Sequence, residues 1–451
     1  MSVFQTDVHA TLPRTIAGNG TELTIEEDNG KTRTILDACG GAAVAAVGHG
    51  NERMIAKIQQ AAGLPYILSH GLGSKHADDL AKYLVEQSPE GSFTSAIFVN
   101  SGSEANEAAL KLSKQYFVEN NEPKRVNYIS RHFSYHGSTL GVLSLGGFQS
   151  RQKPYADVLN KSNFHKVSTC FYYRGAKPGQ TEEEYTQQLL DELDAKFQEL
   201  GPGTVISFTC ETVIGATLGC VPPTKGYIKG CRDICHKYGA LFVLDEVMSG
   251  MGRCGTYHAW EHEMDEGPDL QPVAKVLGGG YVPLAAVLIS PKVDKVFKNG
   301  SGHVVGHQTY QDHIFATSVG LELQKIIKEE KLVERSRVLG LKLENMLKDA
   351  FSDNPNVGDI RGRGLFWDVE FVQDKETKKA FPRPLGFSSK VYKAGMKRGV
   401  HFLKGVGTVD SFEGDHIMLS PPYTVSEEEL TKMVEVLMKS VAEAVEEVNS
   451  S

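Results

Sequence analysis

The sequence lacks a long hydrophobic run and lacks an excess of basic residues. No stretch approaches the length that an apolar helix needs to cross a membrane, and the first residues show no basic segment followed by an apolar one. With 48 Lys and Arg against 56 Asp and Glu, the formal net charge is −8, which disfavours nucleic acid as a partner. We therefore expect a cytoplasmic protein without a membrane or nucleic-acid partner.

Cysteine pairs with the spacing of a disulfide framework or of a zinc site are also missing. The seven cysteines form an odd, scattered set. Cys231 and Cys235 lie one helical turn apart, but no second ligand pair accompanies them. This pattern favours core thiols in a reducing compartment, and we expect no metal site.

The chain does show the alternation of helix-like and strand-like segments that is typical of an α/β protein. Its 451 residues exceed what one small core needs, which favours a large domain with a smaller companion. Segments 105–116 and 228–238 show apolar residues at helical spacing. Between such segments lie short apolar runs typical of buried strands, namely 96–99, 126–129, 205–208, 241–244 and 285–289. We predict a large domain in which a mostly parallel central sheet lies between helices, plus a smaller α/β domain.

The pattern changes from about residue 319. The sequence there predicts a long charged helix over 321–347, a strand over 365–371 and a final helix over 427–448. Near the other end, 23–26 and 34–37 have the pattern of a hairpin. We expect three parts: an N-terminal segment, 1–50, that packs with the small domain; a large domain, 51–320, that contains the central sheet; and a small C-terminal domain, 321–451.

Two residues suggest a specific chemistry. Lys275 is a lone amine in an apolar stretch that ends in three glycines, and burial makes such an amine nucleophilic near neutral pH. Asp245 directly follows an apolar strand. A lysine that binds an aldehyde and an acid that keeps a ring nitrogen protonated are the minimum that pyridoxal phosphate chemistry requires. Either residue alone is more often a solvated loop lysine or a helix cap.

Two turns at strand ends fit a phosphorylated, flat ligand. Ser101, Gly102 and Ser103 lead from a strand directly into a helix, where free N–H groups bind phosphate. Tyr135 and His136 follow the next strand, at the sheet edge where open α/β sheets bind ligands. Taken separately, the first turn is more often an ordinary helix cap and Tyr135 more often a core residue.

These motifs occur in one order, together with the run Asp245–Gly255 and the segment Pro268–Lys275. In that order and spacing the chain resembles a class III (omega) aminotransferase of the pyridoxal phosphate fold type I group. The similarity extends over nearly the whole length, from Leu36 and Asp37 to the Pro421-Pro422 pair.

The resemblance implies roles for individual residues. Lys275 would bind the cofactor aldehyde and later shuttle a proton, and Asp245 would bind the ring nitrogen as a carboxylate. Tyr135 would stack on one face of the ring and Val247 would cover the other. Glu211 occupies the position of the family's active-site glutamate, although Glu-Thr replaces the usual Glu-Pro.

The remaining cofactor contacts come from the same resemblance. Gly102 and Ser103 would hold the phosphate, with Ser101 and His136 beside them. Thr309 matches the threonine that reaches the phosphate of the neighbouring subunit, so the resemblance implies a homodimer with shared active sites. From the sequence alone, Thr309 is equally an ordinary loop hydroxyl.

The chain departs from its family where a substrate carboxylate is bound. Several relatives place an arginine shortly before the Pro-Pro pair, where this chain has Met418. Lys404 is a possible substitute, although a solvated loop lysine is the simpler interpretation. The stretch 39–43 consists of small residues where some relatives carry aromatics, which suggests a roomier pocket. Arg361 and Arg363 are interpreted as structural.

The predicted function is a pyridoxal-phosphate-dependent transaminase. It moves an amino group from an amine or amino acid to an oxo-acid or aldehyde by a ping-pong mechanism. The alternative is an enzyme of the same fold that catalyses epimerisation, decarboxylation or aminomutation, because Lys275 and Asp245 serve all of these reactions. The sequence does not identify the donor or the acceptor.

Overall fold

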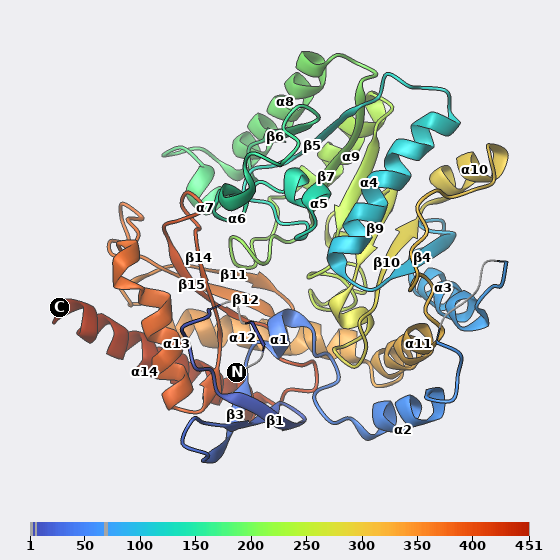
Figure 1. The fold of residues 1–451 in the computed structure, drawn as a ribbon. Coiled ribbons are helices and arrows are strands. Elements are labelled where there is room, and N and C mark those ends of the chain that lie inside the picture. Colours follow the sequence, from blue (N-terminus) through green and yellow to red (C-terminus); the bar gives the residue numbers. More distant parts are fainter. Residues whose placement is uncertain (1–2, 5–6, 67–70, 451) are drawn as a thin grey trace.

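The computed structural model describes residues 1–451 except 1–2, 5–6, 67–70 and 451, and it forms two lobes (Figure 1). The larger lobe is built on a seven-stranded sheet in the order β4-β10-β9-β8-β7-β5-β6. Its strands are β4 (Ser95–Val99), β5 (Asn127–Arg131), β6 (Phe164–Val167), β7 (Val205–Glu211), β8 (Leu241–Asp245), β9 (Leu270–Val273) and β10 (Ala285–Ile289). Only β10 runs antiparallel to its neighbours in this sheet. The predicted mostly parallel sheet is confirmed.

Helices cover both faces of this sheet, and the strand residues divide between them by alternation. In β8, Leu241 and Val243 belong to the apolar cluster that contains α4 (Gly102–Glu119). Phe242 and Leu244 belong to the cluster on the opposite face, with α8 (Glu182–Leu200) and α9 (Tyr227–Lys237). Burial on both faces explains why these strands are continuously apolar rather than alternating with polar residues.

The large lobe also contains shorter elements. Its other helices are α2 (Glu52–Ala61), α3 (Lys75–Gln87), α5 (Leu140–Leu145), α6 (Gln149–Gln152), α7 (Tyr172–Gly175) and α10 (Pro291–Asn299), with 3-10 turns η1 (Lys153–Tyr155), η2 (Ala259–His262) and η3 (Lys275–Leu277). In the described part of the chain, no helix combines the length and apolarity needed to cross a membrane.

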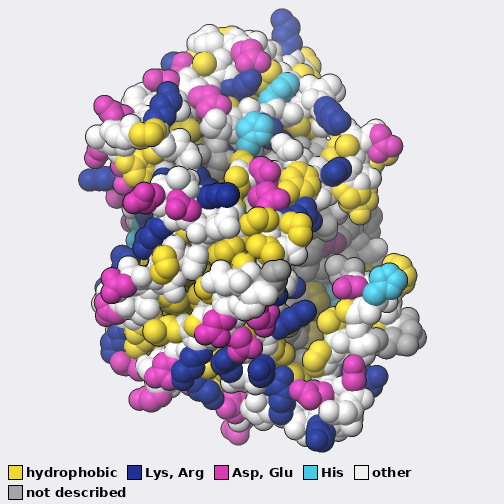
Figure 2. Space-filling model, turned by 90° about the vertical axis from the view of Figure 1, so that its left-hand side faces the viewer, with side chains coloured by type: hydrophobic (Ala, Val, Ile, Leu, Met, Phe, Trp, Pro, Cys, Tyr) yellow, Lys and Arg dark blue, Asp and Glu magenta, His cyan; other side chains and the backbone are white. Residues whose placement is uncertain are grey.

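The smaller lobe contains an antiparallel sheet in the order β11-β12-β15-β14. Its strands are β11 (Val357–Arg363), β12 (Phe366–Phe371), β14 (Leu403–Val406) and β15 (Asp415–Leu419). The helix α13 (Phe387–Lys397), preceded by the turn η4 (Arg383–Leu385), packs on it, and α14 (Glu427–Asn449) packs on α13. Figure 2 shows acidic and basic side chains mixed over one face of the molecule, with hydrophobic side chains gathered near its middle.

A third sheet joins the two ends of the chain. It has the order β1-β2-β3-β13, formed by β1 (Arg14–Asn19), β2 (Glu22–Glu26), β3 (Thr32–Asp37) and β13 (Val400–His401). The predicted hairpin is confirmed as the antiparallel pair β2 and β3. Parallel pairing of β3 with β13 places the N-terminal segment beside the C-terminal lobe.

The single helix predicted over 321–347 is wrong. The chain forms two helices there, α11 (Ile314–Glu329) and α12 (Leu332–Phe351). Lys331 separates them with a left-handed φ of 53°, which an α-helix cannot contain. The helices then pack on different partners, α11 on α2 and α3 and α12 on α14 and β11. The division of the chain at residue 320, which falls inside α11, stays a prediction.

Candidate active site

Six strands of the large sheet run in one direction, so their carboxyl ends meet at one edge. A cavity of about 450 Å³ opens there. Most of the residues predicted to bind the cofactor line it, namely Ser101, Gly102, Ser103, Tyr135, His136, Glu211, Asp245, Val247 and Lys275. Residues that are distant in the sequence therefore share one site.

Lys275 begins the turn that follows β9. Its backbone has a φ of 48°, in the left-handed region that a non-glycine residue rarely adopts. Its Nζ donates a hydrogen bond to the carbonyl of Ala42, over 2.8 Å. Burial lowers the pKa of Lys275 to about 8, with the positive charge of Arg253 acting in the same direction and Asp245 opposing it. About a tenth of this amine is therefore in its nucleophilic form at pH 7, a far larger fraction than for an ordinary lysine.

Asp245 ends β8 with its carboxylate held by three donors. Oδ2 accepts hydrogen bonds from His136 Nδ1 and Asn106 Nδ2, each over 2.8 Å, and Oδ1 accepts from the backbone N–H of Val247 over 2.9 Å. These bonds fix the orientation of the carboxylate. Among the described residues, Nε2 of the buried His136 has no hydrogen-bond partner.

Glu211 ends β7, directly beside Asp245 in the strand register. Its carboxylate accepts hydrogen bonds from the backbone N–H of Tyr135, over 3.0 Å, and of Gly215, over 3.3 Å. Burial raises the pKa of Glu211, and the charges of His136 and Arg131 oppose that rise. The side chain ties the aromatic turn to the sheet.

The phosphate-type turn has the form of an anion cradle. Ser101 caps α4, because its hydroxyl accepts a hydrogen bond from the N–H of Glu104. The first N–H groups of α4 therefore face the cavity without partners inside the helix. A Cβ on Gly102 would lie 2.7 Å from Val247, and one on Gly137 would lie 2.6 Å from the hydroxyl of Ser103. Glycine is required at both positions, because a larger side chain would clash with these neighbours.

Other predicted residues lie elsewhere. Thr309 is exposed and does not line the cavity of its own chain. Met418 is buried in β15, in an apolar cluster with Val213 and Phe366. Lys404 donates to the hydroxyl of Ser389, over 3.0 Å. Neither Met418 nor Lys404 lines the cavity, so neither residue provides a group there that could bind a substrate carboxylate.

The small-residue stretch 39–43 lies beside the cofactor cavity and is not part of its lining. Gly40 and Gly41 line a second cavity, which shares Val44 with the first. The roomier pocket stays a prediction.

Sequence reasoning missed two residues of the site. Asn106 is only 2% exposed and bonds Asp245 from the first turns of α4. A poor helix former four residues after Gly102, on the cavity side of a helix, is the signal that could have revealed it. Arg151 places its guanidinium 4.2 Å from the centre of the Tyr135 ring. It had no sequence signal, because its position depends on the packing of α6.

With this geometry established, comparisons with known proteins identify the family. Residues 8–441 match the model of aminotransferase class III. The chain belongs to the class III aminotransferases. An uncharacterized aminotransferase of Schizosaccharomyces pombe is 44% identical over 98% of this chain and 95% of its own length. The gamma aminobutyrate transaminase 3, chloroplastic, of Solanum lycopersicum is 36% identical over 90% of this chain and 76% of its own length.

Solved structures agree with the fold. The omega transaminase from Pseudomonas jessenii in complex with PMP superposes with a TM-score of 0.90 at 28% identity, covering 99% of this chain and 97% of that chain. A transaminase from the marine bacterium Virgibacillus superposes with a TM-score of 0.90 at 29% identity, covering 99% and 98%. This class III aminotransferase is therefore a pyridoxal-phosphate-dependent enzyme of fold type I that transfers amino groups.

The residues of the cavity fit that cofactor. A carboxylate fixed by three hydrogen bonds, a buried lysine of lowered pKa and a glycine-lined helix N-terminus border one space. They match, in turn, a ring nitrogen, an aldehyde and a phosphate.

Proposed function

We propose that this class III aminotransferase binds pyridoxal phosphate covalently through Lys275 and holds the ring nitrogen protonated with Asp245. The observation that carries the proposal is that a buried amine of lowered pKa and an oriented carboxylate line the same cavity. When bound, the cofactor supplies an aldehyde that accepts amines and a ring that withdraws electrons from the substrate carbon.

The residues around it position that ring and move protons. Tyr135 and Val247 line the cavity and would cover the two faces of that ring, and the turn of Gly102 and Ser103 would hold its phosphate. His136 and Asn106 keep the Asp245 carboxylate directed into the cavity. Once a substrate amine has displaced it, Nζ of Lys275 is the base that removes a proton from the substrate carbon.

We further propose a homodimer in which Thr309 completes the phosphate site of the partner. Thr309 is exposed, and Val305 and Tyr310 beside it are 73% and 51% exposed. Large apolar side chains exposed next to a predicted ligand group support burial by a second copy. Light scattering should give twice the chain mass, and Thr309→Ala should weaken cofactor retention without changing that mass.

The proposed substrates are an amine or amino acid as donor and an oxo-acid or aldehyde as acceptor. The substrate side of the cavity is apolar, with Val213, Met248 and Leu284 among its lining residues. Arg151, whose guanidinium lies over the ring of Tyr135, is the proposed contact for a carboxylate, because Met418 cannot provide one. A cytoplasmic location is part of the proposal, supported by seven free, buried cysteines.

The decisive experiment combines borohydride reduction with a lysine variant. The purified enzyme, reduced in the presence of pyridoxal phosphate, should carry the cofactor on Lys275 in peptide mass spectra. Lys275→Ala should abolish turnover and leave the circular dichroism spectrum unchanged. Lys166→Met is the matched control, since Lys166 is a second lysine whose pKa burial lowers to about 7, and it should keep turnover. Cofactor found on a lysine other than Lys275 would overturn the proposal.

Asp245→Asn tests the second half of the proposal. The variant should still bind the cofactor covalently but lose about 10²–10³-fold in kcat, because the protonated ring nitrogen loses its counter-charge. An unchanged rate would remove Asp245 from this role. A panel of donors against pyruvate and 2-oxoglutarate, followed by conversion of the cofactor to its amine form, would then define the substrates.

A further inference from the structure

A cluster of metal-ligand side chains lies outside the cofactor cavity, where the two ends of the chain meet. Asp37 is the last residue of β3, and His401 is the last residue of β13. The two are direct partners in the parallel register of these strands. Cys39 follows Asp37 by two residues, and its Sγ lies 3.4 Å from Asp37 Oδ1 and 3.2 Å from His401 Nδ1. The third separation, from His401 Nδ1 to Asp37 Oδ1, is 3.7 Å.

These separations are those of ligands that share one small metal ion. A tetrahedral zinc ion binds sulfur at about 2.3 Å and nitrogen or oxygen at about 2.0–2.2 Å, which separates neighbouring ligand atoms by about 3.3–3.6 Å. The three measured distances lie close to that range. Thiolate, imidazole and carboxylate together also suit zinc better than magnesium or calcium, which bind through oxygen alone.

The surroundings orient the ligands as in a built site. Asp37 and Cys39 are each 1% exposed. His49 Nε2 lies 2.9 Å from the second oxygen of Asp37, a contact of the kind that orients carboxylate ligands. The backbone N–H groups of Cys39 and Gly40 donate to the first oxygen. The side chain of His401 is 30% exposed, which gives a metal ion a path from solvent.

We propose that Asp37, Cys39 and His401 bind one Zn²⁺ ion, with water as the fourth ligand. Binding replaces the thiol proton of Cys39, and any proton on His401 Nδ1, by the metal, and both protons go to solvent. Spacing along the sequence predicts no such site, because its ligands lie at positions 37, 39 and 401. The alternative is a hydrogen-bonded cluster that never binds metal.

The site would connect the N-terminal sheet to the C-terminal lobe beside the cofactor cavity. Cys39 leads into α1 (Gly40–Ala43), where Ala42 and Ala43 have left-handed φ values of 67° and 64°. The Ala42 carbonyl accepts the hydrogen bond from Lys275. A metal ion at Cys39 would fix the start of this strained turn without contacting the reacting atoms. Zinc binding should therefore raise the melting temperature of the holoenzyme.

The test measures metal content in untagged holoenzyme, so that no affinity tag contributes ligands. After dialysis against micromolar Zn²⁺ and then metal-free buffer, the wild type should retain one zinc per chain by elemental analysis. Cys39→Ala and His401→Gln should each retain less than about a tenth of that amount. Cys170→Ala is the matched control, since Cys170 is equally buried and bonds Thr224 instead, and it should retain zinc as the wild type does.

Cobalt substitution separates ligation from incidental uptake. Co²⁺-loaded wild type should show ligand-field bands of tetrahedral intensity, at wavelengths longer than the cofactor absorbs, together with a thiolate charge-transfer band. The charge-transfer band should vanish in Cys39→Ala and persist in Cys170→Ala. Equal zinc in wild type and Cys39→Ala, or cobalt bound without a thiolate band, would overturn the proposal. Neither result depends on the role of Lys275.

Discussion

At the scale of single residues, burial decides which groups of this enzyme can react. Lys275 loses its water shell in the cavity, and the pKa of its amine falls to about 8. Glu211, equally enclosed, has its pKa raised instead, because desolvation always disfavours the charged form. The same physical cause therefore prepares a nucleophile from the lysine and favours the neutral acid at the glutamate.

The lowered pKa of Lys275 predicts how cofactor capture depends on pH. Only the neutral amine attacks the aldehyde, and its fraction rises as the pH increases through about 8. In cofactor-free enzyme, the rate constant for covalent capture should therefore increase about tenfold between pH 7 and pH 9 and then level off. Stopped-flow absorbance measures this rate. An increase that continues to pH 10.5 without a plateau would show an unperturbed lysine.

Arg151 provides a prediction about specificity. If its guanidinium contacts the acceptor carboxylate, Arg151→Gln should raise the KM for oxo-acids by about tenfold or more, because a charge-assisted hydrogen bond contributes about 1.5–3 kcal/mol. The KM for an aldehyde acceptor, which has no carboxylate, should not change. Steady-state kinetics with both acceptors measure the difference. Equal changes for the two would assign Arg151 to packing against Tyr135.

At the scale of elements, helix ends decide where α11 gives way to α12 and how the last helix is held. The turn at Lys331 separates α11 from α12, although the sequence there contains neither glycine nor proline. The start of α14, in contrast, is fixed by a local capping motif. Ser426 and Glu429 exchange side-chain-to-backbone hydrogen bonds in a capping box, and Glu429 also accepts a bond from Thr21 of the N-terminal segment.

Removing that cap should weaken the attachment of α14. Ser426→Ala should lower the free energy of unfolding by about 1 kcal/mol, the usual value of an N-cap hydroxyl. Ser450→Ala removes a hydroxyl from the exposed far end of the same helix, where it bonds the Glu446 carbonyl, and should have little effect. Thermal unfolding of the two variants side by side measures the contrast. Equal melting temperatures would mean that packing alone positions α14.

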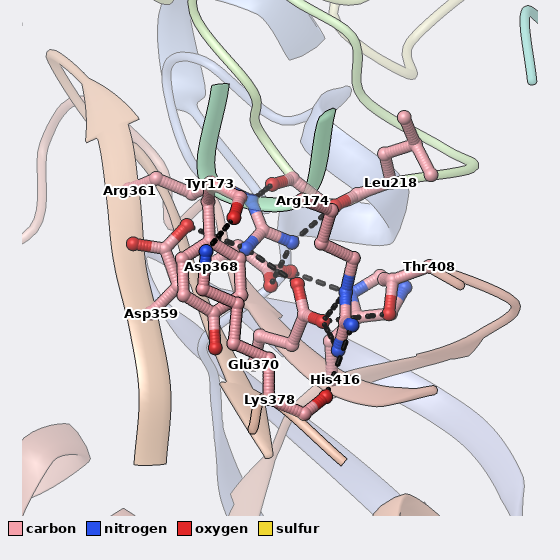
Figure 3. Close-up of polar contacts among 11 residues, drawn as sticks. Tyr173, Arg174, Leu218, Asp359, Arg361, Asp368, Glu370, Lys378, Thr408 and His416 are labelled. Atoms are coloured by element: carbon pink, nitrogen blue, oxygen red, sulfur yellow. Dashed lines mark hydrogen bonds and ion pairs between the residues drawn. The ribbon is translucent and has the colours of Figure 1, made fainter. Parts of the chain in front are cut away.

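At the scale of the whole molecule, a buried charge cluster joins the two lobes (Figure 3). Arg361 of β11 lies 2.7 Å from Glu370 and 2.9 Å from Asp359, and it donates to the carbonyls of Leu218 and Gly219 in the large lobe. Glu370 also accepts from Arg174 of α7. These contacts agree with the structural role predicted for Arg361.

Breaking this cluster should be costly. Arg361→Leu leaves the buried Glu370 with Arg174 as its remaining cationic partner and the buried Asp368 with His416, and it should lower the free energy of unfolding by about 3–5 kcal/mol. Arg337→Leu is the matched control on α12, where the half-exposed arginine pairs with Glu334 at the surface. Calorimetry should show a large loss of melting temperature in the first variant and none in the second. Similar melting temperatures would show that Arg361 is dispensable to the lobe contact.

Much of the cofactor site could be predicted because its residues lie in short local motifs. Ser101 to Ser103 and Tyr135 lie within a few residues of the end of an apolar strand and Asp245 ends one, and parallel strands present their carboxyl ends at one edge. The partners of these residues could not be predicted in the same way. The bond from Asn106 to Asp245 joins positions 139 apart in the sequence, and only the packing of α4 on the sheet brings them together.

The sequence by itself determined the chemical groups of this aminotransferase and indicated five of the seven strands of its large sheet, because apolar periodicity and turn residues act over a few neighbouring positions. Tertiary structure alone decided the break at Lys331, the place of Arg151 over Tyr135 and the meeting of Asp37, Cys39 and His401. Each of these depends on contacts between distant segments, whose free energy comes from burial in the finished fold and leaves no local pattern in the chain.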